Sequence, residues 1–215
     1  MNEIKAIVFD LDGTLTDSKK NIYESIVAAF KDLNISETIK EEEFGKYIGW
    51  HFQEIFDDLG IKNLDLTEFI EAYKSHYYKL LHLTKFYPTV PDTIKLLSEK
   101  GIKVCLLTTK AQDQADYIID HFDLRKYFTY VMGRRPGVEN KPSAEPLQIL
   151  LNDINVNPQN AVMVGDTEMD INCGKNAGVK TVACEYGYRT IEQLKNLEPD
   201  YMITSLKQII NKLEL

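Results

Sequence analysis

Short apolar runs alternate with longer segments of helical periodicity along most of this chain, and this alternation constrains the fold more than any other feature. It is typical of a parallel sheet whose strands are joined by helices. We therefore expect an α/β fold, with a Rossmann-like parallel sheet and helices on both faces. The expected strands are 4–9, 102–107, 127–132, 161–165, 179–183 and 201–203, and the expected helices are 90–100, 112–121, 145–152, 169–176, 190–196 and 205–213.

Residues 17–86 break this alternation, because they carry several amphipathic helical patterns and no convincing strand. We expect an all-helical domain inserted after the first strand, while residues 1–16 and 87–215 form a discontinuous core domain. More than half of the aromatic residues fall in the inserted segment. Large rings bury the most area per residue, which favours a separate small hydrophobic core over the alternative of a ligand-binding box.

The charge balance excludes several classes of partner. The 215 residues have a formal net charge of -8 and no cluster of lysine and arginine, which argues against binding to nucleic acids or an anionic membrane surface. No apolar run approaches the roughly 18 residues of a membrane-spanning helix, and the N-terminal residues lack a signal-peptide pattern. We expect a cytoplasmic protein whose three cysteines, Cys105, Cys173 and Cys184, are buried or incidental thiols.

The segment AIVFDLDGTLTD carries the strongest chemical signal. An apolar strand runs directly into Asp10, and Asp12 follows two residues later, so both carboxylates would face one small volume at the carboxyl end of a strand. Like charges this close are tolerable when a divalent cation neutralises them or when one carboxyl group holds a proton. A plain Asp-Gly turn is the alternative, but the apolar strand and the following Thr14 favour a functional site.

Polar groups follow two further strands. Thr108, Thr109 and Lys110 follow the second expected strand, and Asp166 and Asp170 follow the fourth. The carboxyl ends of parallel strands share one edge, so these groups would meet the DLDGT segment and form a metal-dependent phosphate site. We expect Asp166 and Asp170 to stand one helical turn apart, one near the metal and one supporting it. The alternative for this pair is a helix N-cap and a first-turn acid.

Lys141 lies just ahead of an expected helix and directly before Pro142. A compact ammonium group is a suitable counter-charge for phosphate. A solvated surface lysine is the alternative for this residue. The carboxylates and hydroxyls that follow the expected strands favour the phosphate site over that alternative.

Four segments together resemble the motifs of the haloacid dehalogenase (HAD) superfamily of phosphatases: DLDGT, the strand ending in Thr108, Lys141 before Pro142, and GDTEMD. They have the superfamily's order and spacing, and the resemblance covers essentially the whole chain. The helical insertion resembles the small cap domain of the phosphoglycolate phosphatase-like branch. Dehalogenase members lack an acid at the position of Asp12, since they have no leaving-group oxygen to protonate, so dehalogenation is disfavoured.

The resemblance implies a role for each motif residue. Asp10 would be the nucleophile that forms an aspartyl-phosphate, and Asp12 would be the general acid and then the general base. Thr108 and Lys141 would bind the phosphoryl oxygens. Further substrate contacts are expected from Gly13, Thr14, Thr109, Gly49 and His51, while Mg2+ would be held by Asp10, the main-chain carbonyl of Asp12 and Asp166, with Asp170 steadying Lys141 and the metal.

Substrate preference is expected to lie in the inserted domain, which would close over the site on hinges near 16–18 and 83–87. Residues 45–51, which include Gly49 and His51, form an expected loop where related enzymes place substrate-reading residues. A rim or capping histidine is the alternative for His51. The arginines at 134–135 would reach an acidic substrate group or be solvated. At Thr109 relatives often have Asn, and this departure bears on substrate preference.

The leading hypothesis is a Mg2+-dependent phosphatase for a small phosphorylated metabolite, such as phosphoglycolate, a sugar phosphate, a nucleotide or pyrophosphate. A phosphomutase of the β-phosphoglucomutase type would use the same two aspartates, but the sequence shows no clear second phosphate clamp. A noncatalytic binding protein on the same fold is a third hypothesis, which the filled catalytic positions disfavour. The sequence is compatible with a monomer or a homodimer.

Overall fold

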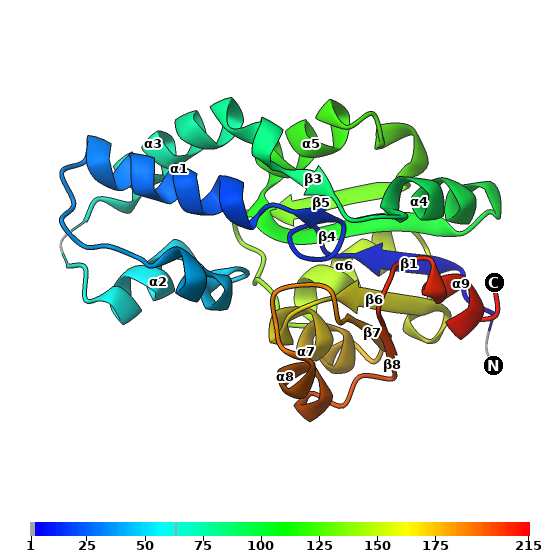
Figure 1. Cartoon of the computed structure of the whole chain (residues 1–215). Helices are drawn as coiled ribbons and strands as arrows, with labels where there is room; N and C mark the ends of the chain where they lie inside the picture. The colour runs from blue at the N-terminus through cyan, green and yellow to red at the C-terminus, as the bar shows by residue number, and fades with distance from the viewer. Residues whose placement is uncertain (1–2, 63) are drawn as a thin grey trace. The chain divides into compact units, whose positions relative to one another are not determined.

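The computed structural model describes residues 3–62 and 64–215. The chain divides into two compact units: a core unit of Met1–Leu15 with Phe86–Leu215, and an inserted unit of Thr16–Lys85. Figure 1 shows the helices and strands of each unit. In the described ranges, no helix combines the length and the apolar character that crossing a lipid bilayer requires.

The core unit is built on a six-stranded sheet in the order β5-β4-β1-β6-β7-β8 (Figure 1). Neighbouring strands pair in parallel. β1 lies between β4 and β6, and all of its residues are buried. This sheet confirms the expected Rossmann-like fold class. The strands are β1 Ala6–Phe9, β4 Lys103–Ala111, β5 Tyr130–Arg134, β6 Ala161–Gly165, β7 Lys180–Cys184 and β8 Tyr201–Ile203.

Helices cover both faces of this sheet. Side chains from one face, among them Val8, Cys105 and Met163, form one hydrophobic cluster with α6 and α7. Figure 1 shows α4 and α5, which contact β4, on the other side of the sheet. Cys105, Cys173 and Cys184 are buried free thiols, as expected. The helices are α4 Val90–Glu99, α5 Gln112–His121, α6 Glu145–Asp153, α7 Glu168–Asn176, α8 Ile191–Asn196 and α9 Gln208–Lys212.

Two of the expected strand boundaries differ from the structure by three residues or more. The second expected strand ends at Leu107, whereas β4 continues to Ala111 after an irregularity in its pairing with β5. Backbone groups make the hydrogen bonds of a sheet, so the polar side chains of residues 108–110 do not end the strand. The third expected strand begins too early, because Arg125–Tyr127 forms a 3-10 turn and β5 starts at Tyr130.

The inserted unit is helical, with a short strand at each end of the insertion. The expectation of no strand here is wrong at those ends, where β2 (Thr16–Asp17) and β3 (Lys85–Phe86) pair with each other. Strands of two residues are too short to leave a periodic pattern in a sequence. The helices of this unit are α1 Lys19–Asp32, α2 Phe52–Leu59 and α3 Leu66–Lys79, with 3-10 turns at Glu41–Tyr47 and Leu81–Leu83.

Aromatic rings form the interior of the inserted unit. Phe69 is fully buried and packs edge to face against Phe56, with ring centroids 4.7 Å apart. Phe30 and Tyr73 also contact Phe69. The rings thus pack against one another, as expected for a small hydrophobic core that gains its buried area from large side chains.

Candidate active site

The candidate site lies at the carboxyl edge of the core sheet, where the chain leaves β1. Asp10 follows β1 directly, and its amide donates to the carbonyl of Val164 in β6 at 2.9 Å. The chain then turns at Gly13, whose φ of 92° lies in the left-handed region that glycine favours. Because parallel strands end at a shared edge, the carboxyl-terminal part of β4 and the residues that follow β6 also come close to Asp10.

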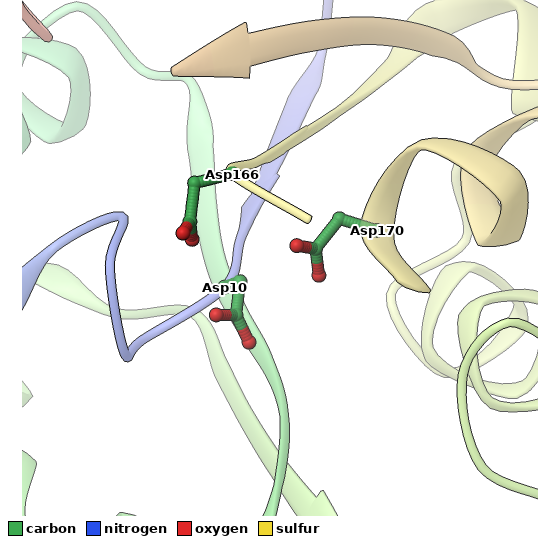
Figure 2. A group of neighbouring side chains, drawn as sticks. All are labelled: Asp10, Asp166 and Asp170. Atoms are coloured by element: carbon green, nitrogen blue, oxygen red, sulfur yellow. The ribbon is translucent and has the colours of Figure 1, made fainter. Parts of the chain in front are cut away.

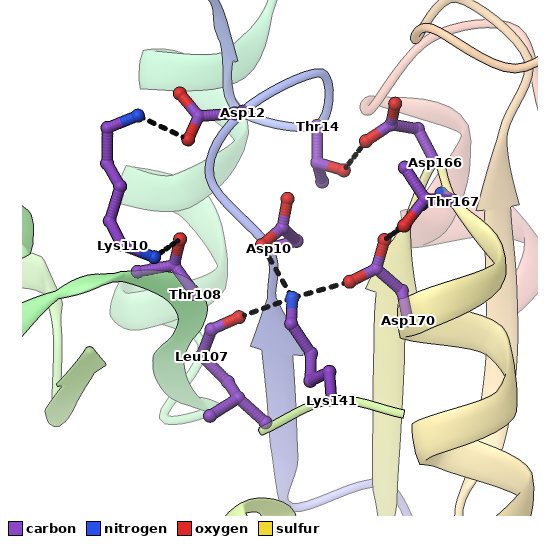
Figure 3. Close-up of polar contacts among 10 residues, drawn as sticks. All are labelled: Asp10, Asp12, Thr14, Leu107, Thr108, Lys110, Lys141, Asp166, Thr167 and Asp170. Atoms are coloured by element: carbon purple, nitrogen blue, oxygen red, sulfur yellow. Dashed lines mark hydrogen bonds and ion pairs between the residues drawn. The ribbon is translucent and has the colours of Figure 1, made fainter. Parts of the chain in front are cut away.

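Four charged side chains meet there and form a buried group that we call the aspartate–lysine cluster: Asp10, Lys141, Asp166 and Asp170. Figure 2 shows its three aspartates, and Figure 3 shows them with Lys141. Lys141 Nζ lies 2.6 Å from Asp10 Oδ1 and 2.6 Å from Asp170 Oδ1. It also donates to the Leu107 carbonyl at 3.0 Å. Carboxylate oxygens of the three aspartates lie within 4.8 Å of one another. Lys141 is therefore not a surface lysine, and three separate segments of the chain contribute to the cluster.

The cluster carries more negative than positive charge. When all three aspartates are ionised, three carboxylates face one ammonium, and two negative charges stay uncompensated in a buried site. Burial, with Asp170 and Asp12 nearby, outweighs Lys141 and raises the pKa of Asp10 from 3.8 to about 7. Burial, with Asp170 and Asp10 nearby, also raises the pKa of Asp166 well above its ordinary value. Burial would lower the pKa of Lys141, but Asp10 and Asp170 raise it above its ordinary value.

Asp166 accepts hydrogen bonds on both carboxylate oxygens. Thr14 Oγ1 donates to Oδ1 at 2.9 Å, and the Tyr188 amide donates to Oδ2 at 2.9 Å. A Cβ atom added at Gly13 or Gly187 would lie 2.2 Å from an Asp166 side-chain atom, so both positions require glycine. The hydroxyl of Thr14, expected near the substrate, thus supports Asp166. The loop that carries Gly187 and Tyr188 is a part of the site that the sequence analysis missed.

An ion pair fixes this loop next to Asp166. Arg189 Nε lies 2.7 Å from Glu168 Oε2, and Arg189 Nη2 lies 2.9 Å from Glu168 Oε1. The arginine is 7% exposed. A two-bonded guanidinium–carboxylate pair has a defined geometry, so it ties the loop after β7 to the first turn of α7. This pair was also absent from the sequence analysis.

Asp170 joins the site to helix α7. Thr167 is the N-cap of this helix, and its amide and hydroxyl donate to Asp170 Oδ2 at 3.0 Å and 2.8 Å. Oδ1 accepts from Lys141, so one oxygen caps the helix and the other belongs to the cluster. The expected spacing is wrong in one respect: Asp166 lies before the N-cap, outside the helix, and does not stand one helical turn from Asp170.

The carboxylate of Asp12 lies apart from the three clustered aspartates and pairs with another lysine. Asp12 Oδ2 lies 2.6 Å from Lys110 Nζ, and the two side chains are 12% and 8% exposed (Figure 3). Lys110 is among the polar residues expected at the strand end, where no role is predicted for it. Its amide donates to Thr108 Oγ1 at 3.3 Å, and Thr108 is buried at the same end of β4.

The remaining expected substrate contacts lie in two places. Thr109 is half-buried and lines a small crevice together with the arginines at 134–135. Gly49 and His51 belong to the inserted unit, where His51 is the N-cap of α2 and its amide donates to Glu54 Oε2 at 2.8 Å. The capping alternative for His51 is therefore observed, and the substrate role of Gly49 and His51 stays a prediction.

Comparison with known proteins identifies the family. The sequence profile of haloacid dehalogenase-like hydrolases matches residues 7–184, a range that includes the whole aspartate–lysine cluster. The chain belongs to this family. The phosphoglycolate phosphatase of Aquifex aeolicus (strain VF5) is 31% identical over 98% of this chain and 97% of its own length. The pyrophosphatase PpaX of Bacillus pumilus (strain SAFR-032) is 33% identical over 98% of this chain and 97% of its own length.

Solved structures of predicted phosphatases have the same fold as this chain. A predicted phosphatase from Clostridium acetobutylicum has a TM-score of 0.86 and 26% identity, with all of both chains covered. A predicted phosphoglycolate phosphatase from Haemophilus somnus 129pt has a TM-score of 0.85 and 25% identity, with 99% of both chains covered. The expected superfamily, its fold with an inserted helical domain and its phosphatase class are thereby confirmed.

Proposed function

We propose that this HAD-family phosphatase hydrolyses a small phosphorylated metabolite through an aspartyl-phosphate on Asp10, with Mg2+ as its cofactor. The observation that carries the proposal is the aspartate–lysine cluster, in which three carboxylates and one ammonium group meet at the carboxyl edge of the core sheet. Three ionised carboxylates would repel a phosphate alone. They suit a divalent cation and a phosphoryl group bound together.

The donor atoms of the cluster fit Mg2+. They are oxygens, which hard cations prefer, and two uncompensated charges match a divalent ion. Asp10 and Asp166 would hold the ion together with the main-chain carbonyl of Asp12. Asp170 links Lys141 to the N-cap of α7, so it would orient Lys141 and the surroundings of the metal. When bound, the ion would neutralise charge on the phosphoryl group.

The side chains of the site would divide the reaction between them. A carboxylate oxygen of Asp10 would bond to phosphorus while the bond from phosphorus to the leaving oxygen breaks. Asp12 would give a proton to that oxygen and later take one from the water that hydrolyses the aspartyl-phosphate. Lys141 and the Thr108 hydroxyl would bind the phosphoryl oxygens.

The relatives indicate which substrates to test first. The two relatives at 31% and 33% identity are named for phosphoglycolate and for pyrophosphate. Phosphoglycolate and pyrophosphate should therefore be the first substrates tested, in a panel that also contains sugar phosphates and nucleotides. The same panel detects the phosphomutase alternative, since a mutase would convert a sugar 1-phosphate into the 6-phosphate without releasing phosphate.

The experiment measures phosphate release from this panel with Mg2+ and compares the wild type with Asp10→Asn. We expect activity to fall roughly ten-thousandfold or more, because the variant lacks the nucleophile. Asp92→Asn changes an exposed acid on α4 and is the matched control, which should keep its activity. Phosphate release that survives in Asp10→Asn would contradict the proposal.

A further inference from the structure

A second lysine lies at the carboxyl edge of the core sheet, outside the aspartate–lysine cluster. Lys110 Nζ is 2.6 Å from Asp12 Oδ2, and both side chains are shielded from solvent. In Figure 3 this pair lies on one side of Asp10, and Asp166 and Asp170 lie on the other. The acids proposed to hold and support the metal thus face one side of the nucleophile, while Asp12 and Lys110 face the opposite side.

The strand fixes the position of Lys110. β4 continues to Ala111, and Lys110 lies in its last part, within the irregularity that interrupts the pairing with β5 between Leu107 and Ala111. The hydrogen bond from the Lys110 amide to Thr108 Oγ1 adds a local restraint. A charged group on a strand is held more precisely than one on a loop, so Lys110 is suited to binding one group of a substrate selectively.

The two lysines of this edge contact different carboxylates. Lys141 contacts two carboxylates, those of Asp10 and Asp170. Lys110 contacts the carboxylate of Asp12. An ammonium group has three N–H donors and contacts more than one anion at a time, as Lys141 does with Asp10 and Asp170.

We infer that Lys110 is a specificity residue for substrates whose leaving group carries an anion, either a carboxylate or a second phosphate. The inference rests on the proposed function, in which Asp12 gives its proton to the leaving oxygen. The atoms attached to that oxygen then lie on the side of Asp10 where Lys110 stands. Lys110 stabilises a desolvated anion there, whereas a neutral leaving group gains no such interaction.

The test compares substrates that differ in this charge. Phosphoglycolate and 2-hydroxyethyl phosphate both release a two-carbon alcohol, but the first carries a carboxylate where the second carries a hydroxymethyl group. For the wild type with Mg2+, we expect kcat/KM for phosphoglycolate or for pyrophosphate to exceed that for 2-hydroxyethyl phosphate by about thirtyfold or more. A higher value for phosphoglycolate identifies a carboxylate as the preferred anion, and a higher value for pyrophosphate identifies a second phosphate.

Variants of Lys110 separate charge recognition from support of Asp12. Lys110→Met removes the charge. We expect the ratio of kcat/KM for the preferred anionic substrate to kcat/KM for 2-hydroxyethyl phosphate to fall about thirtyfold. Lys110→Arg keeps the charge and should keep most of the preference. Lys95→Met removes an exposed lysine of α4 as a matched control, and its ratio should equal that of the wild type.

Two outcomes would overturn the inference. The first is a wild-type enzyme whose kcat/KM is no higher for either anionic substrate than for 2-hydroxyethyl phosphate. Equal losses on phosphoglycolate and 2-hydroxyethyl phosphate in Lys110→Met would also overturn it, because a lysine that only positions Asp12 affects these two alcohol leaving groups alike. Phosphate release from no substrate of the panel would instead refute the proposed function, and this inference with it, so the two failures are distinguishable.

Discussion

Among the described residues, the core unit buries one aromatic side chain, Phe9, whereas the inserted unit buries seven: Phe30, Phe44, Tyr47, Phe56, Phe69, Tyr73 and Tyr77. The core unit is organised by a parallel sheet covered on both faces, where aliphatic side chains pack in layers. The inserted unit is a small helical unit with few positions for layers. The comparison shows how two units of one chain bury apolar area by different means.

The two units also differ in the polar groups that they bury. The core unit buries charged side chains, namely the aspartate–lysine cluster and Arg189. In the described part of the inserted unit the buried polar side chains are uncharged: Thr16, Ser18, Asn21, Ser25 and Thr84. Among the described residues, buried charged side chains therefore occur in the core unit, where a sheet packed from both sides holds the backbone in place. Mutations in the two units should consequently have separable effects.

Lys141→Met should give the largest effect on the core unit. Removing one partner of a buried ion pair typically costs about 3 to 5 kcal/mol of stability, because the remaining charges lose their counter-charge. Loss of a preorganised charge that binds the phosphoryl group should also lower kcat roughly a hundredfold to a thousandfold. Chemical denaturation without metal and phosphate release with Mg2+ measure the two effects. Wild-type kcat in this variant would remove Lys141 from the proposed reaction.

Phe69→Ala should destabilise the inserted unit by about 3 to 5 kcal/mol, since it opens a cavity among the packed rings. Hydrogen exchange resolved by residue should show lost protection within Thr16–Lys85 and unchanged protection in β1, β4 and β6. Mg2+ binding should persist, because the expected ligands belong to the core unit. An equal loss of protection in the sheet would show that the two units are not separately stabilised.

A pH series probes a charge that is particular to the core unit. Folding raises the pKa of Asp10 from 3.8 to about 7. Between these values the folded chain binds more protons than the unfolded chain, so stability decreases as the pH rises. Without metal, the wild type should therefore lose stability relative to Asp10→Asn from about pH 4 to about pH 7, by a few kcal/mol at most. Urea denaturation at several pH values measures this, and a difference that does not change with pH would contradict it.

Arg189→Met should give the smallest effect. Its two bonds to Glu168 hold the loop whose Tyr188 amide donates to Asp166, so their loss should cost about 1 to 3 kcal/mol and weaken Mg2+ binding about tenfold. Calorimetric titration with Mg2+ measures the affinity. Arg125→Met is the matched control, because that arginine is 41% exposed and its ion pairs should contribute below about 1 kcal/mol. Equal changes in both variants would argue against a special role for Arg189.

Much of the site could be predicted from the sequence because of one geometric rule. Parallel strands bring their carboxyl ends to one edge, so Asp10, Thr108 and Asp166 could be expected together although they lie far apart in the chain. Lys141 could be added from its place before a helix and from the resemblance to a known family. The helix-capping alternative for Asp170 could be stated as well. The sequence did not reveal that one carboxylate oxygen of Asp170 caps α7 while the other accepts from Lys141.

The contacts that could not be predicted depend on the path of the backbone. The pair between Lys110 and Asp12 requires β4 to continue past an irregularity in its pairing with β5, and no local pattern indicates this. The contact from the Tyr188 amide to Asp166 depends on a loop after β7 whose conformation is set by distant packing. Gly187 is needed because that loop passes close to Asp166, which only the folded chain shows.

The interior position of β1 also bears on the order in which the protein is made. A ribosome synthesises β1 first among the strands, but its neighbours β4 and β6 emerge much later, and β6 ends only at Gly165. The residues of the inserted unit, Thr16–Lys85, are all complete before β4 begins. During translation the helical unit is able to assemble while the central strand, and with it the nucleophile, still lacks the partners that create the site.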